Sequence, residues 1–477
     1  MSTLKEKTAQ GLLWGGLNSG IQQLVGLAFG IVLGRLLSPS DYGMMAMISI
    51  FSLVATALQD SGFRTALTNI EHPKHEDYNS VFWFNIIMAS SLYVILFLAA
   101  PLIGEYYHTP RVVPLCRYAF LSIVIASFGT AQSAYLFKHL RAKQQAEAGA
   151  LAVILSSLTG VGMAFAGMAY WSLATQGLVY VGINTLLQWH FSPWRPSIHG
   201  ITFAPVRRMF RFSCKILATT IMTHVNNNVL NILLGHYFTP RDTGNYNQAY
   251  QWNNKCYSLV QSMVAQVAQP VLVSLNGEEG RQKDVFRKMM RFTAFITFPL
   301  LFGFGLVAKE FIVTAIGEKW LASAQLIQIL CLSGAAMPLS TLFSNMIISK
   351  GRSGTFFWCT FTLGLVQIAT MIMIWPMGIR WMVIAYTLLN TSWLLVWLFF
   401  VRRLIGYGYW MFFCDVMPFA LAAAGVMGVA YVATMPLSNM IALLITRFII
   451  AVVLYYVVMK LARVKILAEC ERFVKRS

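Results

Sequence analysis

The amino-acid sequence predicts an all-α polytopic membrane protein of about fourteen transmembrane helices with no large soluble domain. Hydrophobic residues make up 57% of the 477 residues and charged residues only 11%, far below the quarter or so that is usual in soluble domains. Apolar runs long enough to cross a bilayer, about 20 residues each, recur along the whole chain. Short stretches that collect Lys, Arg, Pro and Asn separate these runs, so water is not the main solvent of the chain.

The expected helices follow the apolar runs in order. The first run follows a short basic head that resembles a secretory signal, but it is too long and has no small-residue cleavage site, so we interpret it as a retained helix. The predicted helices cover residues 11–37, 42–62, 80–103, 112–137, 147–168, 171–191, 211–237, 242–272, 288–308, 322–348, 355–376, 381–401, 411–435 and 438–461.

The loops between these helices are too short for a catalytic domain. The longest predicted loops hold about fifteen residues, and the predicted external segment at residues 309–321 is short. The sequence has no Walker motif, no GxSxG, no HExxH and no metal-spaced Cys or His cluster. The seven cysteines form no CxxC and are interpreted as small buried apolar side chains. The sequence therefore predicts a protein that is not an enzyme and that uses no cofactor or metal.

The net charge of +19 could indicate a nucleic-acid partner, but the positions of the charges point to a membrane. With fourteen helices and a cytoplasmic N-terminus, 27 of the 36 basic residues fall on the cytoplasmic side. This bias is the one that the positive-inside rule predicts, and it places both termini in the cytoplasm. Segments near Lys143, Arg208, Lys283 and Lys475 are expected inside, and those near Arg241 and Lys319 outside. No nucleic-acid partner is needed.

Two ten-residue segments indicate an internal duplication. Residues 34–43 read GRLLSPSDYG and residues 235–244 read GHYFTPRDTG, an offset of 201 residues. They share Gly, Pro, Asp and Gly in register, and each joins the first two helices of one half. The Pro and Asp are expected at N1 and in the first turn of the following helix, where a missing N–H and a negative charge are tolerated or favoured. A duplication explains this shared position better than chance does.

The offset predicts the domain organisation. Two units of this length leave enough chain for two further helices, so we expect two six-helix lobes at residues 1–200 and 201–402, with two extra helices and a basic tail at 403–477. Six is an even number, so the two halves enter the membrane in the same direction and form a parallel repeat. Substrate sites in such transporters lie between the halves.

Polar side chains form stripes on three of the predicted helices. In helix 242–272 they recur at spacings of 3 or 4 residues, which places them on one face. Helix 211–237 carries a second stripe, with His224 beside it, and helix 11–37 carries Gln22 among glycines. Interhelical hydrogen bonding would explain any single residue, whereas seven in register on one helix favour a shared aqueous cavity. The stripe of helix 242–272 consists of Gln248, Gln251, Lys255, Ser258, Ser262, Gln266 and Gln269. The stripe of helix 211–237 consists of Thr220, Thr223, Asn227 and Asn231.

Lys255 is predicted near mid-membrane with no acidic residue at its depth. An unpaired charge there costs about 2.5–3.5 kcal/mol on insertion scales, so a lysine kept at this position is suited to an anionic ligand. The alternative is a lysine that snorkels or lies in water. Arg117 and Arg447 are further cationic candidates, but both are expected nearer the outer helix ends, where they would snorkel.

The chain resembles, nearly end to end, the polysaccharide-transporter (Wzx-like, O-antigen flippase) family of the multidrug/oligosaccharidyl-lipid/polysaccharide exporter superfamily. Four short segments, in order along the chain, carry the resemblance: residues 34–43, Asp60-Ser61-Gly62-Phe63, Ser192-Pro193-Trp194-Arg195-Pro196 and Gly317-Glu318-Lys319-Trp320. Family members often have Arg after the Tyr-Asn that begins the eighth helix. Here Tyr246-Asn247 is followed by Gln248, which shifts the cationic role toward Lys255.

The resemblance implies a bacterial inner-membrane flippase. Its substrate would be an undecaprenyl-pyrophosphate-linked oligosaccharide for lipopolysaccharide O-antigen, capsule or exopolysaccharide, moved from the cytoplasmic to the periplasmic leaflet by alternating access. The implied partners are this lipid-linked substrate, membrane lipids, a polysaccharide polymerase and chain-length machinery. H⁺ or Na⁺ would be the coupling ion, and His224 is a candidate proton carrier.

Two other functions stay open from the sequence. A cation-coupled small-molecule antiporter of the same superfamily is expected to carry a buried carboxylate in a lobe, and no lone mid-membrane carboxylate is evident there. A membrane-embedded glycosyltransferase or polymerase would need a large external loop or catalytic acidic residues.

Overall fold

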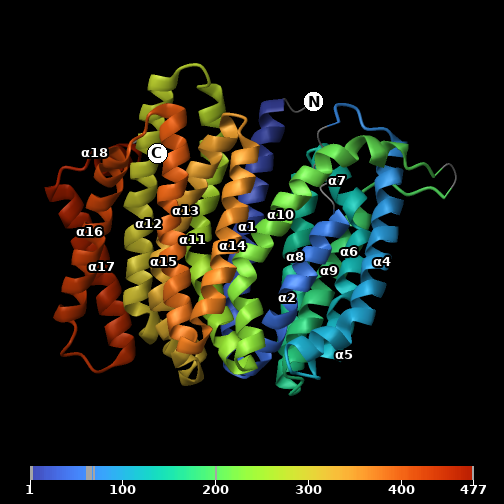
Figure 1. Ribbon diagram of the computed structural model, residues 1–477, viewed down its shortest axis with the longest axis horizontal. Helices are drawn as coiled ribbons and strands as arrows, with labels where there is room; N and C mark the ends of the chain where they lie inside the picture. Colours follow the sequence, from blue (N-terminus) through green and yellow to red (C-terminus); the bar gives the residue numbers. More distant parts are fainter. Residues whose placement is uncertain (1–3, 61–66, 68–69, 199–200, 475–477) are drawn as a thin grey trace. The chain divides into compact units, whose positions relative to one another are not determined.

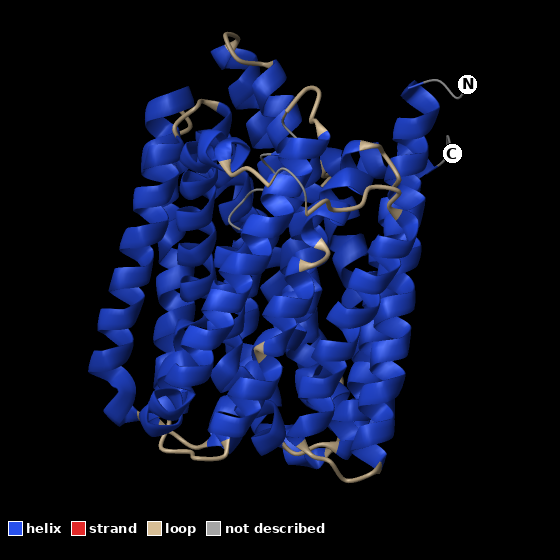
Figure 2. Cartoon of the chain, turned by 90° about the vertical axis from the view of Figure 1, so that its right-hand side faces the viewer, coloured by secondary structure: helices blue, strands red, loops and turns tan. Residues whose placement is uncertain are grey.

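The computed structural model describes residues 4–60, 67, 70–198 and 201–474. Within these ranges the secondary structure consists of helices joined by short loops, as Figure 2 shows, with no strand. A chain in hydrocarbon has to satisfy its backbone hydrogen bonds internally, and helices do so within one segment. The predicted all-α class is confirmed.

Seventeen α-helices and two 3₁₀ turns make up the described chain (Figure 1). They are α1 (Leu4–Leu36), α2 (Pro39–Asp60), α4 (His75–Tyr106), α5 (Val112–Ala119), α6 (Leu121–Ser127), α7 (Thr130–Lys138), α8 (Ala142–Phe165), α9 (Tyr170–Phe191), α10 (Ala204–Tyr237), α11 (Pro240–Ser274), α12 (Glu279–Ile316), η1 (Glu318–Trp320), α13 (Leu321–Ser349), α14 (Ser353–Ile374), η2 (Trp375–Met377), α15 (Ile379–Ile405), α16 (Tyr409–Ala433), α17 (Met440–Leu461) and α18 (Lys465–Val474).

These helices make the protein a polytopic membrane protein. Among the described residues, ten helices are long and apolar enough to cross a membrane, and the bent group α5 to α7 makes an eleventh. The other three predicted runs correspond to α1, α9 and α10. Each of the fourteen predicted runs therefore has one helix, or one bent group of helices, in the described chain.

The helices extend further than the apolar runs that predicted them. α12 continues to Ile316, whereas the sequence placed the end of this helix at residue 308, so most of the expected external segment 309–321 is helical and this boundary was wrong. Hydrophobicity marks only the part of a helix that lies in hydrocarbon, and a helix continues into the polar layer as long as its residues allow.

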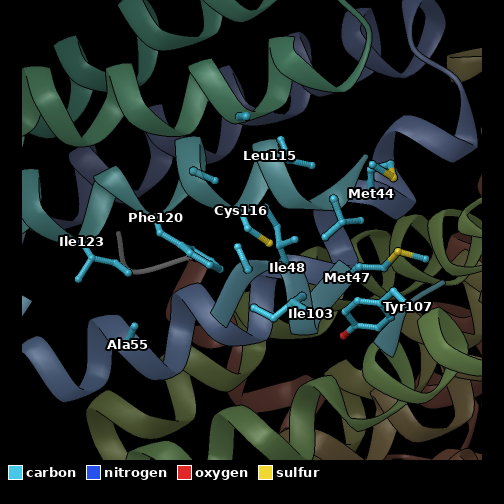
Figure 3. Packing of buried hydrophobic residues seen from close by; sticks show 14 of the residues in the cluster. Met44, Met47, Ile48, Ala55, Ile103, Tyr107, Leu115, Cys116, Phe120 and Ile123 are labelled. Atoms are coloured by element: carbon cyan, nitrogen blue, oxygen red, sulfur yellow. The ribbon is translucent and has the colours of Figure 1, made fainter. Parts of the chain in front are cut away.

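The chain forms two compact units, Met1–Gly244 and Asn245–Ser477. The first has an apolar core built from α2, α4, α5 and α6, in which Met47, Leu115 and Phe120 are fully buried, as Figure 3 shows. In the second, α12 packs against α13, α16 and α17. The three-part division at residues 200 and 402 stays a prediction.

The two repeated segments fold alike at the starts of α2 and α11. Pro39 and Pro240 are the first residues of these helices, as expected. Ser38 Oγ donates to Asp41 Oδ2 over 2.6 Å, and its oxygen accepts the Asp41 N–H. Thr239 and Asp242 repeat both contacts with the same 2.6 Å separation. Each pair satisfies N–H groups that have no partner within the helix, which supports the predicted duplication.

The repeated segments also touch each other through two glycines, both in the first unit. A Cβ atom at Gly43 would overlap the carbonyl oxygen of Pro240, and a Cβ at Gly244 would overlap that of Pro39. The two contacts are equivalent under the offset of 201 residues. The first turns of α2 and α11 therefore cross backbone against backbone, at one end of the unit, and only glycine fits at the crossing.

We predict that Gly43→Ala and Gly244→Ala each lower the stability of the protein by roughly 1–3 kcal/mol, because the added methyl group overlaps backbone that cannot turn aside. The measurement is thermal unfolding of the purified protein in detergent. Gly177→Ala in α9 is the control, since a Cβ there meets nothing within 4 Å. Unchanged melting temperatures for both crossing variants would contradict the prediction.

Candidate functional site

One face of α11 packs against α13 in the second unit and is attached to it by hydrogen bonds. Ser323 Oγ donates to Asn245 Oδ1 over 3.0 Å, and Gln261 Nε2 donates to Thr341 Oγ1 over 2.8 Å. Between these positions, Asn253 is buried against Gly334, where a Cβ would collide with the amide. These contacts pin α11 to α13 along one side.

The predicted polar stripe of α11 lies mostly away from this attachment. Gln251, Ser262, Gln266 and Gln269 are exposed, Lys255 and Ser258 are half-buried, and Gln248 is buried. The hydrogen bond found for Ser258 goes to the backbone oxygen of Lys255 in its own helix. Within the described residues, none of these side chains hydrogen-bonds another helix. The stripe is therefore an accessible polar face and not a set of interhelical hydrogen bonds.

Lys255 rests on an aromatic ring. Its Nζ lies 4.5 Å from the ring centroid of Trp252, one turn earlier in α11, and Trp252 is buried with its ring edge-to-face on Phe311 at 5.1 Å. In the described part of the chain, no carboxylate pairs with Lys255. A cation over an indole face gains about 0.5–2 kcal/mol, less than a desolvated charge needs, so the ammonium stays available to an anion. Sequence reasoning missed Trp252, although its i, i+3 spacing from Lys255 was a usable signal.

The stripe of α10 divides between two surroundings. α10 packs on α2 and α4 in the first unit, and Asn231 is buried there with its Nδ2 3.4 Å from Asn228 Oδ1. Asn228 in turn donates to the backbone oxygen of His224 over 2.9 Å. Asn227 and His224 remain half-buried. Asn231 thus belongs to a packed helix interface, and Asn227 and His224 are the more accessible members.

Gln22 and Arg117 lie elsewhere in the first unit. Gln22 is half-buried on α1. The Arg117 guanidinium lies 4.3 Å from the ring centroid of Phe97 on α4, and its Nε donates to the Phe97 oxygen over 3.5 Å. Arg117 is therefore held along α4 by contacts that fix its position.

Arg447 does not snorkel, contrary to the sequence interpretation. Its side chain is buried and its NH1 lies 2.8 Å from Glu310 Oε1. Its Nε donates to Thr434 Oγ1 over 3.0 Å. The sequence placed Glu310 in an external loop, whereas the longer α12 brings it beside α17. Arg447 thereby joins α17 to α12, and its charge is balanced within the protein.

The absence of a buried carboxylate was a second wrong expectation. Glu310 and Asp415 are both buried, and Asp415 accepts bonds from Arg287, Arg291 and the Tyr407 hydroxyl. Burial, and then the charge of Asp415, raise the pKa of Tyr407, which keeps its hydroxyl a donor. Both carboxylates are ion-paired with arginines, which the sequence could not reveal because the partners lie more than a hundred residues away. The lack of a buried carboxylate is therefore no longer an argument against the antiporter function.

Comparison with known proteins places the chain in a family. Residues 32–325 match the family described as "Polysaccharide biosynthesis protein". The chain belongs to this family. The match covers both repeated segments and the whole of α11, and it confirms the resemblance drawn from the sequence motifs. Of those motifs, Ser61-Gly62-Phe63 lies outside the described residues.

Curated relatives are similar to this chain at low sequence identity. The lipopolysaccharide biosynthesis protein WzxC of Escherichia coli (strain K12) is 24% identical over 73% of this chain and 71% of its own length. The teichuronic acid biosynthesis protein TuaB of Bacillus subtilis (strain 168) is 23% identical over 75% of this chain and 74% of its own.

Solved structures share the fold. The lipid II flippase MurJ, in an inward closed conformation, superposes with a TM-score of 0.75 at 14% identity, covering 95% of this chain and all of MurJ. An inward-facing multidrug resistance MATE family transporter of the MOP superfamily gives 0.66 at 16% identity, covering 81% of this chain and 94% of that one. At identities of 14% and 16%, these two similarities show that the chain shares the fold, and they say nothing about its function.

We predict that Arg447→Met destabilises the protein by about 3–5 kcal/mol, because it leaves the Glu310 carboxylate buried without its cation. The double variant Arg447→Met/Glu310→Leu should recover most of that loss, since it removes both charges. Thermal unfolding in detergent measures both. The exposed pair Lys143 and Glu147, 3.8 Å apart, supplies the control: Lys143→Met should change stability by less than about 1 kcal/mol. Equal losses for the single and double variants would contradict the prediction.

Proposed function

We propose that this protein is a flippase that moves undecaprenyl-pyrophosphate-linked oligosaccharide from the cytoplasmic to the periplasmic leaflet of a bacterial inner membrane by alternating access. The product would serve the assembly of lipopolysaccharide O-antigen, capsule or exopolysaccharide. The protein makes or breaks no covalent bond in this proposal. The names of its relatives, the lipopolysaccharide biosynthesis protein WzxC and the teichuronic acid biosynthesis protein TuaB, and of the lipid II flippase MurJ support this substrate class.

The observation that carries the proposal is the accessible polar face of α11 with Lys255 along it. A sugar headgroup needs amides and hydroxyls along its path, because hydroxyls left unpaired in hydrocarbon cost several kcal/mol each. Gln251, Ser262, Gln266 and Gln269 offer such groups. Lys255 lies about 22 Å along α11 from its first residue, at 1.5 Å per residue, and offers the charge that a pyrophosphate requires.

The ammonium over Trp252 fits a transient binding group. Lysine carries a compact charge on a flexible four-carbon stem, so Nζ can leave the indole face for a phosphate oxygen and return when the substrate departs. An ion-paired cation such as Arg447 would first have to give up its carboxylate. In this scheme Lys255 binds the pyrophosphate, the polar face of α11 carries the sugars, and the prenyl chain stays in the bilayer.

The remaining parts of the proposal concern coupling, orientation and partners. We infer that H⁺ or Na⁺ drives transport, with the half-buried His224 as a candidate proton carrier. Both termini would be cytoplasmic, as the basic-residue bias indicates. A polysaccharide polymerase and chain-length machinery would act on the delivered substrate.

We predict that Lys255→Ala abolishes export of lipid-linked oligosaccharide while the protein still inserts and folds. Removing an unpaired cation from the membrane should cost no stability and by insertion scales could add about 2 kcal/mol. Lys255→Arg should keep partial activity because the charge survives with a different shape and hydration. The measurement is export in a strain that lacks its own flippase, with protein amount determined in parallel.

Lys309→Ala serves as the matched control, since Lys309 is an exposed lysine of α12 in the same unit, and it should export normally. Normal export by well-expressed Lys255→Ala would rule out the phosphate-binding role. Export of small cationic drugs in place of lipid-linked sugar would favour the antiporter.

We predict that a cysteine replacing Lys143 is protected from a membrane-impermeant thiol reagent in intact cells, and that one replacing Arg241 is labelled. Both side chains lie at helix ends and both sites are accessible in the structure. Labelling of the parent protein, with its native cysteines, gives the background. The reverse pattern would invert the proposed orientation.

A further inference from the structure

The second unit contains a long apolar cavity beside α12. Its volume is about 770 Å³, and its walls come mainly from α12 and α17, with Met427 of α16, Cys256 of α11 and Leu467 of α18 completing them. Figure 1 shows α12, α16 and α17 side by side. Along α12 the lining runs from Phe295 to Phe311, about 24 Å at 1.5 Å per residue. Most of the lining side chains are apolar, so the cavity suits a hydrocarbon chain.

Ion pairs lie near both ends of this cavity. At one end, Arg447 of α17 pairs with Glu310 of α12. At the other, Asp415 of α16 pairs with Arg287 and Arg291 of α12. The α16–α17 hairpin is thus fixed to α12 at two levels, and the cavity lies between these levels.

At the Asp415 end, two guanidinium groups share one fully buried carboxylate. Asp284 also acts on the charge of Arg287. Arg287 makes two bonds to Asp415, at 2.9 and 3.1 Å, whereas Arg291 uses only its Nε and keeps 44% of its side chain exposed. Within the described residues the two terminal nitrogens of Arg291 have no hydrogen-bond partner, so they can bind a further anion.

This charged end continues directly into the apolar cavity. Phe295, the first lining residue of α12, lies four residues after Arg291 and hence one turn further on the same face. Its ring packs against Tyr455 at 5.8 Å between centroids. Leu467 of α18 also lines the cavity here, and Lys288 pairs with Glu469 of the same helix over 2.7 Å. A cationic group and an apolar slot are therefore adjacent, as the head and tail of an amphiphile require.

We propose that this site binds an anionic phospholipid, with its phosphate on Arg291 and one acyl chain in the cavity between α12, α16 and α17. The two terminal nitrogens of Arg291 form one fork, which matches two oxygens of a single phosphodiester. Charge-assisted bonds from a guanidinium to phosphate are short and strong. The bound lipid would fill the hollow between the two ion-paired levels and brace the hairpin against α12.

The test uses the full-length protein in nanodiscs of phosphatidylcholine with or without phosphatidylglycerol. We expect phosphatidylglycerol to raise the melting temperature and to be retained on the protein in native mass spectrometry. Arg291→Gln should bind it about tenfold more weakly, the effect of one lost charge-assisted bond, while Arg287 and Tyr407 still satisfy Asp415. Arg403→Gln is the control, because that guanidinium lies 4.2 Å from the Phe399 ring and is not among the described partners of Asp415.

A second variant tests the tail independently of charge. Gly303 lines the cavity, and a Cβ there would make an ordinary contact of 3.4 Å with Met427, so Gly303→Leu should fold and fill the slot. It should lose phosphatidylglycerol binding, whereas Leu421→Phe, on the exposed side of α16, should not. Unchanged binding by Arg291→Gln and Gly303→Leu would overturn the proposal. Binding of a prenyl pyrophosphate but not of phosphatidylglycerol would also overturn it.

Discussion

Hydrocarbon offers no hydrogen-bond partner, so each N–H and C=O group of a membrane-spanning chain has to be satisfied by the protein itself. This constraint explains both the helices and the treatment of their interruptions. Between α6 and α7 the span bends by 42°, and side chains of α9 reach the carbonyls at the break. Trp189 Nε1 donates to Phe128 O over 2.7 Å, and Thr185 Oγ1 donates to Ile125 O over 3.3 Å. At the bend, side-chain donors of α9 thus take the place of the backbone N–H groups that would bond these carbonyls in a continuous helix.

The same constraint applied to charge separates two kinds of cation in the second unit. Arg287 and Arg447 are ion-paired with Asp415 and Glu310, and these pairs hold α16 and α17 to α12, while Arg291 shares Asp415 through its Nε alone. Among the described residues, Lys255 is paired with the face of Trp252 and with no carboxylate. A charge already balanced by a carboxylate serves packing, whereas one balanced weakly by a ring keeps affinity for a ligand. Lys255 and the terminal nitrogens of Arg291 are the cationic groups left for ligands, which is the physical reason for assigning the substrate to α11 and the lipid to α12.

The duplicated segments show how a repeat in sequence becomes a contact in space. Each copy caps its own helix with a hydroxyl and a carboxylate, a local device that needs no other part of the chain. Gly43 and Gly244 then allow the two copies to meet at backbone distance. A side chain at either position would collide with the backbone of the opposite segment, so glycine is required at both copies of the motif by a contact with the other copy, which is offset by 201 residues.

The sequence by itself determined the class of the fold, because a hydrophobic run of about 20 residues has few stable structures in a membrane other than a helix. It also determined the helix starts at Pro39 and Pro240 and the polar spacing of α11, which depend on neighbours within one or two turns.

Only the tertiary structure decided which charges are satisfied. Arg447 and Glu310 lie 137 residues apart, and Arg287 and Asp415 lie 128 apart, and no local pattern connects them. Tertiary packing likewise buried Asn231 of the α10 stripe while leaving most of the α11 stripe accessible. A helical pattern shows which residues share a face, but the partner of that face depends on contacts between distant segments, which one sequence does not encode locally.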